Sequence, residues 1–194
     1  EYCELLGSSS IMPDTDGGTV FFATSLNNGW GNSRDSIMNC IIGPAAPDKL
    51  PSKGVYGRSY HPQQWENYTN SGNVITDNEI YDFYLESGCA GIYLRYGNGG
   101  WTIDGNRIYQ TSSRIMNGIM YGIYFQNAEY DSYNIRNFNR NIIGYASGKQ
   151  SGTLTVTGNG SFGGIVFNVL SNEEINIKDN IISDLNVTSS AGTF

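Results

Sequence analysis

Several acidic side chains recur at related positions of the chain, and their carboxylates are the groups best suited to chemistry. Asp77 and Glu79 flank one asparagine, Asp82 follows them, and Asp104 and Asp184 stand near the equivalent positions of later segments. Calcium prefers several hard oxygen ligands, so Asp77 and Asp104 are candidate metal ligands. A glycoside hydrolase instead needs two carboxyl groups at a defined separation. The alternative is that most of these acids are solvated residues at turns and strand edges.

Aromatic and polar residues also recur together, two positions apart. Tyrosine occupies three equivalent positions, and each is followed two residues later by arginine or glutamine. Such a stripe suits a polysaccharide, because aromatic faces stack on sugar rings and polar tips bond hydroxyl groups. The alternative is that the tyrosines pair across strands and only stabilise a sheet. The candidate ligand-binding residues are Tyr56, Arg58, Tyr93, Arg95, Tyr124 and Gln126.

These positions can be compared because a short sequence motif, called the asparagine word below, repeats along the chain. An apolar residue is followed three places later by asparagine and two places after that by another apolar residue, as in Ile103, Asn106 and Ile108. A repeat of this kind decides the architecture before any single residue does. The other copies are Ile75, Asn78 and Ile80; Phe138, Asn141 and Ile143; Ile177, Asn180 and Ile182; and a weaker copy with Ile37, Cys40 and Ile42.

A second motif, in which glycine opens a run of alternating residues, stands between the copies of the first. The two motifs alternate strictly, so one glycine-led strand and one asparagine word form one structural unit. The unit length varies, which predicts insertions between fixed strands. The glycines are Gly54, Gly91, Gly122 and Gly164, and the insertions are Pro44–Lys53, His61–Asn73, Gln110–Asn117, Asn127–Ser132 and Tyr145–Gly160, the last with room for an extra strand at Thr153–Thr157.

The short alternating segments exclude a helical solenoid, which needs long segments with a 3.6-residue period. They predict a β-solenoid, in which each strand pairs in register with its counterpart one coil away. The repeat resembles that of the right-handed parallel β-helix of pectate-lyase-like enzymes and many secreted surface proteins. The resemblance implies one all-β domain over residues 1–194, with about five coils in residues 19–187. Residues 1–17 show no period and are expected to form an irregular lead-in.

In such a solenoid, equivalent positions of successive coils stack on one another, which predicts a role for each repeated residue. Side chains alternate along a strand, so the isoleucines of both motifs should point inward and form the core. Asparagine tolerates bent backbone, and its amide can bond backbone groups at a corner or another asparagine stacked on it. Cys40 in this slot is expected to be a small buried thiol. The expected structural ladder is Asn78, Asn106, Asn141 and Asn180.

The resemblance also implies what a catalytic member would carry. Pectate-lyase-like enzymes use clustered aspartates for calcium and an arginine or lysine base, and galacturonase-like relatives use several aspartates with a Gly-His-Gly segment. The chain has one histidine, His61, and no Gly-His-Gly segment. A lyase reaction could use Arg95 with Asp82 or Glu86. The missing signatures favour a non-catalytic protein without a cofactor, and calcium is the one ion that the acids suggest.

Composition limits the partners and the compartment. The net charge is −7 at pH 7, so the chain lacks the basic stripe that nucleic acid requires. Charge-free stretches are short, so no membrane span is expected. The cysteines Cys3, Cys40 and Cys89 are odd in number, and their spacing leaves any pairing open.

The two ends of the predicted solenoid show no evident cap, although a solenoid must cover its terminal strands. The run Asn186–Phe194 is small and polar, and the chain opens on Glu1. We therefore expect a segment of a longer secreted protein, whose ends are covered by the rest of the parent chain or by another subunit. The leading hypothesis is a non-catalytic adhesive, structural or glycan-binding role at a bacterial cell surface. The alternatives are a polysaccharide lyase or glycoside hydrolase of the pectate-lyase-like class, and a subunit of a larger extracellular assembly.

Overall fold

The computed structural model describes residues 3–10, 15–24, 31–59, 69–126, 135–169 and 174–189. Regular structure in these ranges consists of β-strands, and all pairs of named strands are parallel. The predicted parallel all-β class is therefore confirmed. The search of these ranges for a helix able to cross a membrane finds none. His61 and the insertion Asn127–Ser132 lie outside the described residues.

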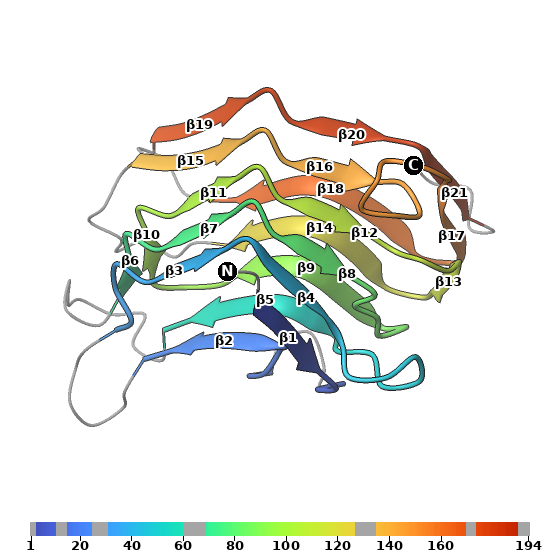
Figure 1. Cartoon of the computed structure of the whole chain (residues 1–194), viewed down its shortest axis with the longest axis horizontal. Coiled ribbons are helices and arrows are strands. Elements are labelled where there is room, and N and C mark those ends of the chain that lie inside the picture. Colours follow the sequence, from blue (N-terminus) through green and yellow to red (C-terminus); the bar gives the residue numbers. More distant parts are fainter. Residues whose placement is uncertain are drawn as a thin grey trace.

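Three long sheets are built from strands that are far apart in the sequence (Figure 1). The first sheet has the order β1 (Cys3–Gly7), β4 (Cys40–Pro44), β8 (Glu79–Tyr81), β12 (Arg107–Tyr109), β16 (Ile142–Gly144) and β20 (Ile181–Ser183). The second has the order β3 (Ser36–Met38), β7 (Val74–Thr76), β11 (Thr102–Asp104), β15 (Ile135–Asn139) and β19 (Glu174–Lys178). The third has the order β2 (Val20–Ala23), β5 (Lys53–Arg58), β9 (Gly88–Leu94), β14 (Ile119–Gln126) and β18 (Ser161–Asn168). Between successive strands of one sheet, the chain passes through the other two.

Two smaller sheets include one strand from each of three predicted insertions. A fourth sheet contains β13 (Arg114–Met116), β17 (Leu154–Gly158) and β21 (Leu185–Ser189), and a two-stranded sheet contains β6 (Asn70–Ser71) and β10 (Asn98–Gly99). The extra strand expected near Thr153–Thr157 is present as β17. The segment Gln110–Asn117, expected to be an insertion, also contains a strand, β13, and Met116 from β13 and Leu154 and Val156 from β17 bury their side chains in the core.

The register aligns the repeated words residue for residue. In the second sheet, Ile103 pairs with Ile75 on one side and with Phe138 on the other. The first sheet aligns its strands in the same way. Away from the end layers the side chains of both columns are buried, from Ile75 to Phe138 in one and from Ile42 to Ile143 in the other, so the core is a stack of equivalent positions. The two columns are Ile37, Ile75, Ile103, Phe138 and Ile177, and Ile42, Ile80, Ile108, Ile143 and Ile182.

A single residue in the left-handed conformation turns the chain from the second sheet into the first. This residue stands directly before each ladder position, and its φ lies between 52° and 67° in all copies. Asparagine, aspartate and glycine adopt this conformation most readily. Asp77 and Asp179 share a repeat position for this reason. The corner residues are Asn39, Asp77, Gly105, Arg140 and Asp179.

The glycines of the second motif lie where the third sheet meets the first. A Cβ atom on Gly91 would stand 2.6 Å from Cγ2 of Ile108 and 2.8 Å from the carbonyl oxygen of Gly122. Gly54 and Gly164 have the equivalent contact with an isoleucine of the first sheet. The repeated glycine is therefore required by the close approach of two sheets, which leaves no room for a methyl group.

The N-terminal segment corrects one expectation, because residues 1–17 are not wholly irregular. Strand β1 pairs with β4 along its whole length, so that Cys3 lies opposite Cys40 and Leu5 opposite Ile42. Cys3 and Leu5 have the spacing of the last two positions of the repeated word. The period could not be recognised because only the last two positions of the word, one of them filled by cysteine, are found here.

The last described layer exposes side chains that the inner layers bury. Ile177 is 52% exposed and Ile182 is 48% exposed, whereas Ile103 and Ile108 in the same columns are buried. Strands β18, β19 and β20 each pair with a neighbour on one side only in the described part of the chain. This end therefore presents an apolar surface and unpaired strand edges.

The three cysteines are free thiols. Cys3 is exposed, whereas Cys40 and Cys89 are buried. The prediction of a buried thiol at Cys40 is confirmed, and its Sγ lies 3.2 Å from the carbonyl oxygen of Met38.

Candidate functional site

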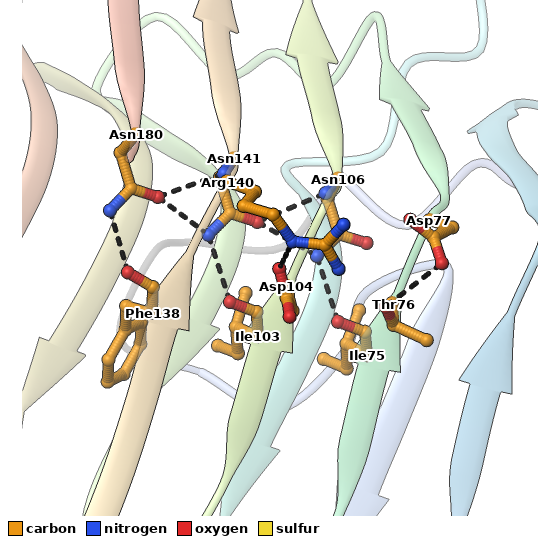
Figure 2. Close-up of polar contacts among 10 residues, drawn as sticks. All are labelled: Ile75, Thr76, Asp77, Ile103, Asp104, Asn106, Phe138, Arg140, Asn141 and Asn180. Atoms are coloured by element: carbon orange, nitrogen blue, oxygen red, sulfur yellow. Dashed lines mark hydrogen bonds and ion pairs between the residues drawn. The ribbon is translucent and has the colours of Figure 1, made fainter. Parts of the chain in front are cut away.

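The repeated asparagines form one continuous column of hydrogen bonds at the corner between the second and first sheets (Figure 2). Oδ1 of Asn141 accepts hydrogen bonds from Nδ2 of Asn106 at 3.0 Å and from its backbone N–H at 3.1 Å. Nδ2 of Asn106 also donates to the carbonyl oxygen of Ile75 at 2.9 Å. Asn78 and Asn180 continue the pattern. The donors and acceptor of the Asn106 side-chain amide are all used within the column, so this residue contributes to the stability of the fold.

The two candidate metal ligands have separate partners. Oδ1 of Asp104 accepts a hydrogen bond from Nε of Arg140 at 2.8 Å, and Asp77 is a corner residue whose Oδ2 accepts a hydrogen bond from the Thr76 hydroxyl at 3.3 Å (Figure 2). Among the described residues, no group of three or more His, Cys, Asp and Glu side chains could hold a metal ion.

Strand β9 separates Arg95 from Asp82 and Glu86, the two acids that a lyase reaction was expected to use with it. Glu86 precedes strand β9 and Arg95 follows it, and a strand of seven residues spans about 20 Å. Asp82 lies in the segment before β9 and is 2.6 Å from Nη2 of Arg114. The Glu86 carboxylate accepts a hydrogen bond from the side chain of Asn117. The sequence places these residues near one another in the chain, but an extended strand separates the arginine from both acids.

The predicted tyrosine column is present on the outer face of the third sheet. The register pairs Tyr93 with Tyr56 and with Tyr124. Their ring centroids are 5.3 Å and 4.9 Å apart, and Phe21 extends the column at 5.2 Å from Tyr56. Tyr56 and Tyr93 belong to a small apolar cluster that is separate from the main core, and Tyr124 packs against it. Contacts between aromatic rings on neighbouring strands are therefore part of this face.

The expectation of an open stripe along this column is wrong at one end. Tyr56 is fully buried and Tyr93 is only 4% exposed, whereas Tyr124 is half-buried. Lys53, itself fully buried, has its Nζ 4.3 Å from the centroid of the Tyr56 ring and donates to the carbonyl oxygen of Thr15 at 2.7 Å. A segment far away in the sequence thus covers the Tyr56 end, and the Tyr124 end is the accessible one.

Tyr121 joins the accessible end, although strict alternation would place it on the other face from Tyr124. Residues on both sides of Gly122 pair with β9 and β18, but Gly122 itself does not. This interruption shifts the alternation by one residue. The rings of Tyr121 and Tyr124 consequently stack, with centroids 4.4 Å apart and planes inclined by 16°. The glycine between the two tyrosines is the signal that could have revealed this in the sequence.

A cavity of about 460 Å³ lies over this part of the third sheet. Its volume falls in the range of sites that hold small molecules. The aromatic part of its wall is formed by tyrosines of β9 and β14, and its charged part by lysine and arginine, with no carboxylate among the described lining residues. The lining residues are Lys53, Ser87, Gly88, Cys89, Ala90, Tyr93, Arg95, Gly118, Ile119, Tyr121, Tyr124 and Gln126.

Arg95 and Arg58 stand in different electrostatic surroundings. Burial disfavours the charged form of Arg95, but hydrogen bonding to Tyr96 and attraction to neighbouring tyrosines outweigh it and raise the pKa of Arg95. Its guanidinium carbon lies 4.9 Å from the centroid of the Tyr96 ring. Nη1 of Arg58 instead lies 3.1 Å from Oδ1 of Asp16. Arg95 therefore places a guanidinium group in the cavity lining, and Arg58 of the neighbouring layer pairs with Asp16.

Gln126 is oriented by two tyrosines beside the cavity. The Tyr93 hydroxyl donates to Oε1 of Gln126 at 2.8 Å, and Nε2 of Gln126 donates to the Tyr96 hydroxyl at 3.3 Å. The two bonds set the direction of the amide before any ligand arrives, which lowers the entropy that binding must overcome. A neutral amide, a fixed cation and two stacked phenol rings thus converge on one hollow.

This arrangement is suited to binding. Flat aromatic faces, an amide and a guanidinium can hold a polar molecule with an apolar face. The two carboxyl groups of a glycoside hydrolase are absent from the described lining of the cavity. No family model, no curated protein and no solved structure matches the chain.

Proposed function

We propose that the chain is a right-handed parallel β-helix of about five coils and that the outer face of its third sheet binds polysaccharide outside the cell. The support for the solenoid is the strand order, in which the chain passes through all three long sheets before it returns to the first. Parallel strands joined by crossovers within one sheet are right-handed in almost all proteins. Glycan binding, with the adhesive or structural role that it allows, is the non-catalytic function that this architecture supports best.

The observation that carries the proposal is the stacked pair Tyr121 and Tyr124 in the wall of the cavity. Both rings are half-buried, and because Tyr124 also stacks on Tyr93, Tyr121 is the ring of the pair whose outer face a ligand can cover. A sugar ring can lie on such a surface with its apolar face, and its hydroxyl groups can then bond Gln126 and Arg95. Arg95 also suits an acidic group on the ligand.

Binding is tested with an array of bacterial, plant and animal polysaccharides, followed by calorimetry on each ligand found. Tyr124→Ala is expected to weaken binding by roughly tenfold or more, because a hot-spot aromatic contributes about 2 kcal/mol. Tyr81→Ala is the matched control, since Tyr81 is stacked on Tyr109 at 5.5 Å but belongs to the first sheet. Equal affinities for Tyr124→Ala and the unchanged protein would mean that the ligand binds somewhere other than this cavity.

The alternative of a polysaccharide lyase or glycoside hydrolase is tested on the same polysaccharides. Each bound polymer is incubated with the protein, and the release of unsaturated products or new reducing ends is measured. Any such release that is lost on heat denaturation of the protein would contradict a non-catalytic role. The extracellular location is tested separately by asking whether protease added to intact cells of the source organism removes the protein.

A second candidate function is that of a subunit in a larger extracellular assembly, and the exposed isoleucines of the last layer favour it. Among the described strands, β1, β2 and β3 at the other end of the same sheets also have a neighbour on one side only. A second copy could therefore continue all three sheets by placing these strands against β20, β18 and β19. Sedimentation over a wide concentration range should then show association that Ile182→Lys abolishes. A concentration-independent monomer would mean that a second copy does not cover this end, and would leave the rest of a parent chain as its cover.

A further inference from the structure

The asparagine column ends in two cysteines. The backbone N–H of Cys40 donates to Oδ1 of Asn78 at 2.9 Å, in the way that each asparagine backbone donates to the next amide. Cys40 therefore occupies the ladder slot, and the register places Cys3 directly opposite it on the neighbouring strand. Two thiols thus follow one another in a column that is otherwise made of amides. A thiol cannot reproduce the amide-to-amide hydrogen bond, so the first two layers lack that link.

The register brings the Cα atoms of these two residues into the range of a disulfide, and the Cβ atoms must move a few tenths of an ångström closer than the strand spacing. Paired parallel strands lie about 4.8 Å apart, and the two Cα atoms of a disulfide are usually about 4.4–6.8 Å apart. Residues in register on neighbouring parallel strands also point their side chains in the same direction. Cys3 and Cys40 are the first residues of β1 and β4, so a small adjustment of one strand end can bring the sulfur atoms together.

We propose that Cys3 and Cys40 form a disulfide that joins the first two layers when the protein meets a low-molecular-weight disulfide such as oxidised glutathione. The exposed thiolate of Cys3 attacks one glutathione sulfur, which forms a mixed disulfide and expels one glutathione thiolate. The Cys40 thiolate then attacks the Cys3 sulfur and expels the second. Two protein thiols lose two protons and two electrons, and one oxidised glutathione becomes two glutathione thiols.

The third cysteine is a built-in control. Cys89 lies on β9 in the main core and is 2% exposed. Burial raises the pKa of its thiol to about 12, so it holds little of the thiolate that exchange requires. Cys3 and Cys40 are therefore the pair among the three cysteines that can undergo this exchange. It does not depend on glycan binding, because both cysteines lie outside the described lining of the cavity.

The test equilibrates the folded protein with a glutathione redox buffer of oxidising composition, traps free thiols with iodoacetamide in denaturant, and maps the peptides by mass spectrometry. The expected product is one cross-linked pair of peptides carrying Cys3 and Cys40, with alkylation at Cys89 alone. Cys89→Ser should give the same cross-link, and Cys3→Ser should abolish it while circular dichroism stays unchanged. The oxidised protein should melt on the order of 5–10 °C above the reduced one, a difference that Cys3→Ser removes.

Three results would overturn the inference. Glutathione that remains attached to Cys3 would show that the Cys40 thiol cannot reach it. A dimer joined through two Cys3 residues would show that the exposed thiol prefers another molecule. Alkylation of both Cys3 and Cys40 after incubation in the most oxidising buffer would show that the pair does not form at all.

Discussion

Asn106 and Asn180 occupy the same column, but Asn106 is fully buried between two other amides whereas Asn180 ends the described part of the column and is partly exposed. Replacing Asn106 with alanine removes the acceptor of the backbone and side-chain donors of Asn78 and leaves them buried. An unsatisfied buried group costs about 1–3 kcal/mol. The loss in unfolding free energy for Asn106→Ala should therefore be roughly 2–5 kcal/mol, measured by urea denaturation. Asn180→Ala should lose clearly less, because water can reach the groups that it leaves. Equal losses would contradict the importance of burial in this column.

The core columns allow the same comparison for apolar side chains. Ile103 is fully buried and Ile177 is 52% exposed, although both stand in one column of the second sheet. Ile103→Ala should lower the unfolding free energy by about 2–5 kcal/mol, through lost transfer energy and a residual cavity. Ile177→Ala should change it by less than about 1 kcal/mol. A large effect of Ile177→Ala in dilute protein would mean that another molecule or segment covers it.

The glycines at the contact between sheets should differ in their tolerance of a methyl group. A Cβ atom on Gly91 would press on the backbone oxygen of Gly122 and on the buried Ile108, and neither can move easily. Gly91→Ala should therefore destabilise the protein by about 1–3 kcal/mol. The matched variant Gly164→Ala should cost less, because its nearest contact is Cδ1 of Ile182, which is half-exposed and mobile enough to turn away. Thermal denaturation of both variants measures this difference, and equal decreases in melting temperature would contradict it.

Tyr93 should assist ligand binding through Gln126 without touching the ligand strongly itself. Tyr93→Phe keeps the ring in the column but removes the hydroxyl that donates to Oε1 of Gln126. A hydrogen bond of this kind contributes about 0.5–1.5 kcal/mol, so affinity for a bound polysaccharide should fall roughly two- to tenfold. Gln126→Ala should show a similar loss, and the double variant should lose no more than the larger single loss. Additive losses measured by calorimetry would mean that the two residues act independently.

Alkaline pH should weaken the fold through Cys89. Burial raises the pKa of this thiol from its ordinary value of 9.0 to about 12, so the unfolded chain releases the proton at lower pH than the folded one. Below about pH 9 both states hold the proton and the contribution to stability is constant. Above pH 9 the free energy of unfolding falls by up to about 1.4 kcal/mol per pH unit until the pH approaches 12. Urea denaturation of reduced protein between pH 8 and pH 10 should show this slope beginning at about 9, and Cys89→Ala should flatten it. An identical slope in the variant would assign the effect to other groups.

Local repetition made much of the fold predictable. The isoleucine and asparagine columns follow from one repeated motif, because equivalent positions of parallel strands stack when the strands pair in register. The class of the fold was therefore accessible from Ile103, Asn106 and Ile108 and their copies. The same comparison places Asp77 and Asp179 in one slot, but only the backbone shows that this slot needs the left-handed conformation.

The site was less predictable, because it depends on contacts between layers and between distant segments. Alternation places Tyr56 on the outer face correctly, but Lys53 and Thr15 decide that it is covered. The partner of Asp82 is Arg114, from the following layer, and no local pattern reveals that pair. Tyr121 was missed because the interruption at Gly122 breaks the simple alternation on which the prediction relied.

Each strand of the long sheets pairs only with its neighbours in the same sheet, one layer before and one layer after it. Local unfolding should therefore begin at the first and last layers of the stack. Amide hydrogens of β9 and β12, which have neighbours on both sides, should exchange with deuterium only through nearly complete unfolding. Those of β19 and β20 should exchange far sooner through fraying. The cavity over β9 and β14 then lies in the slowly exchanging interior of the stack, so a ligand would meet a site that is already rigid and would protect few additional amides.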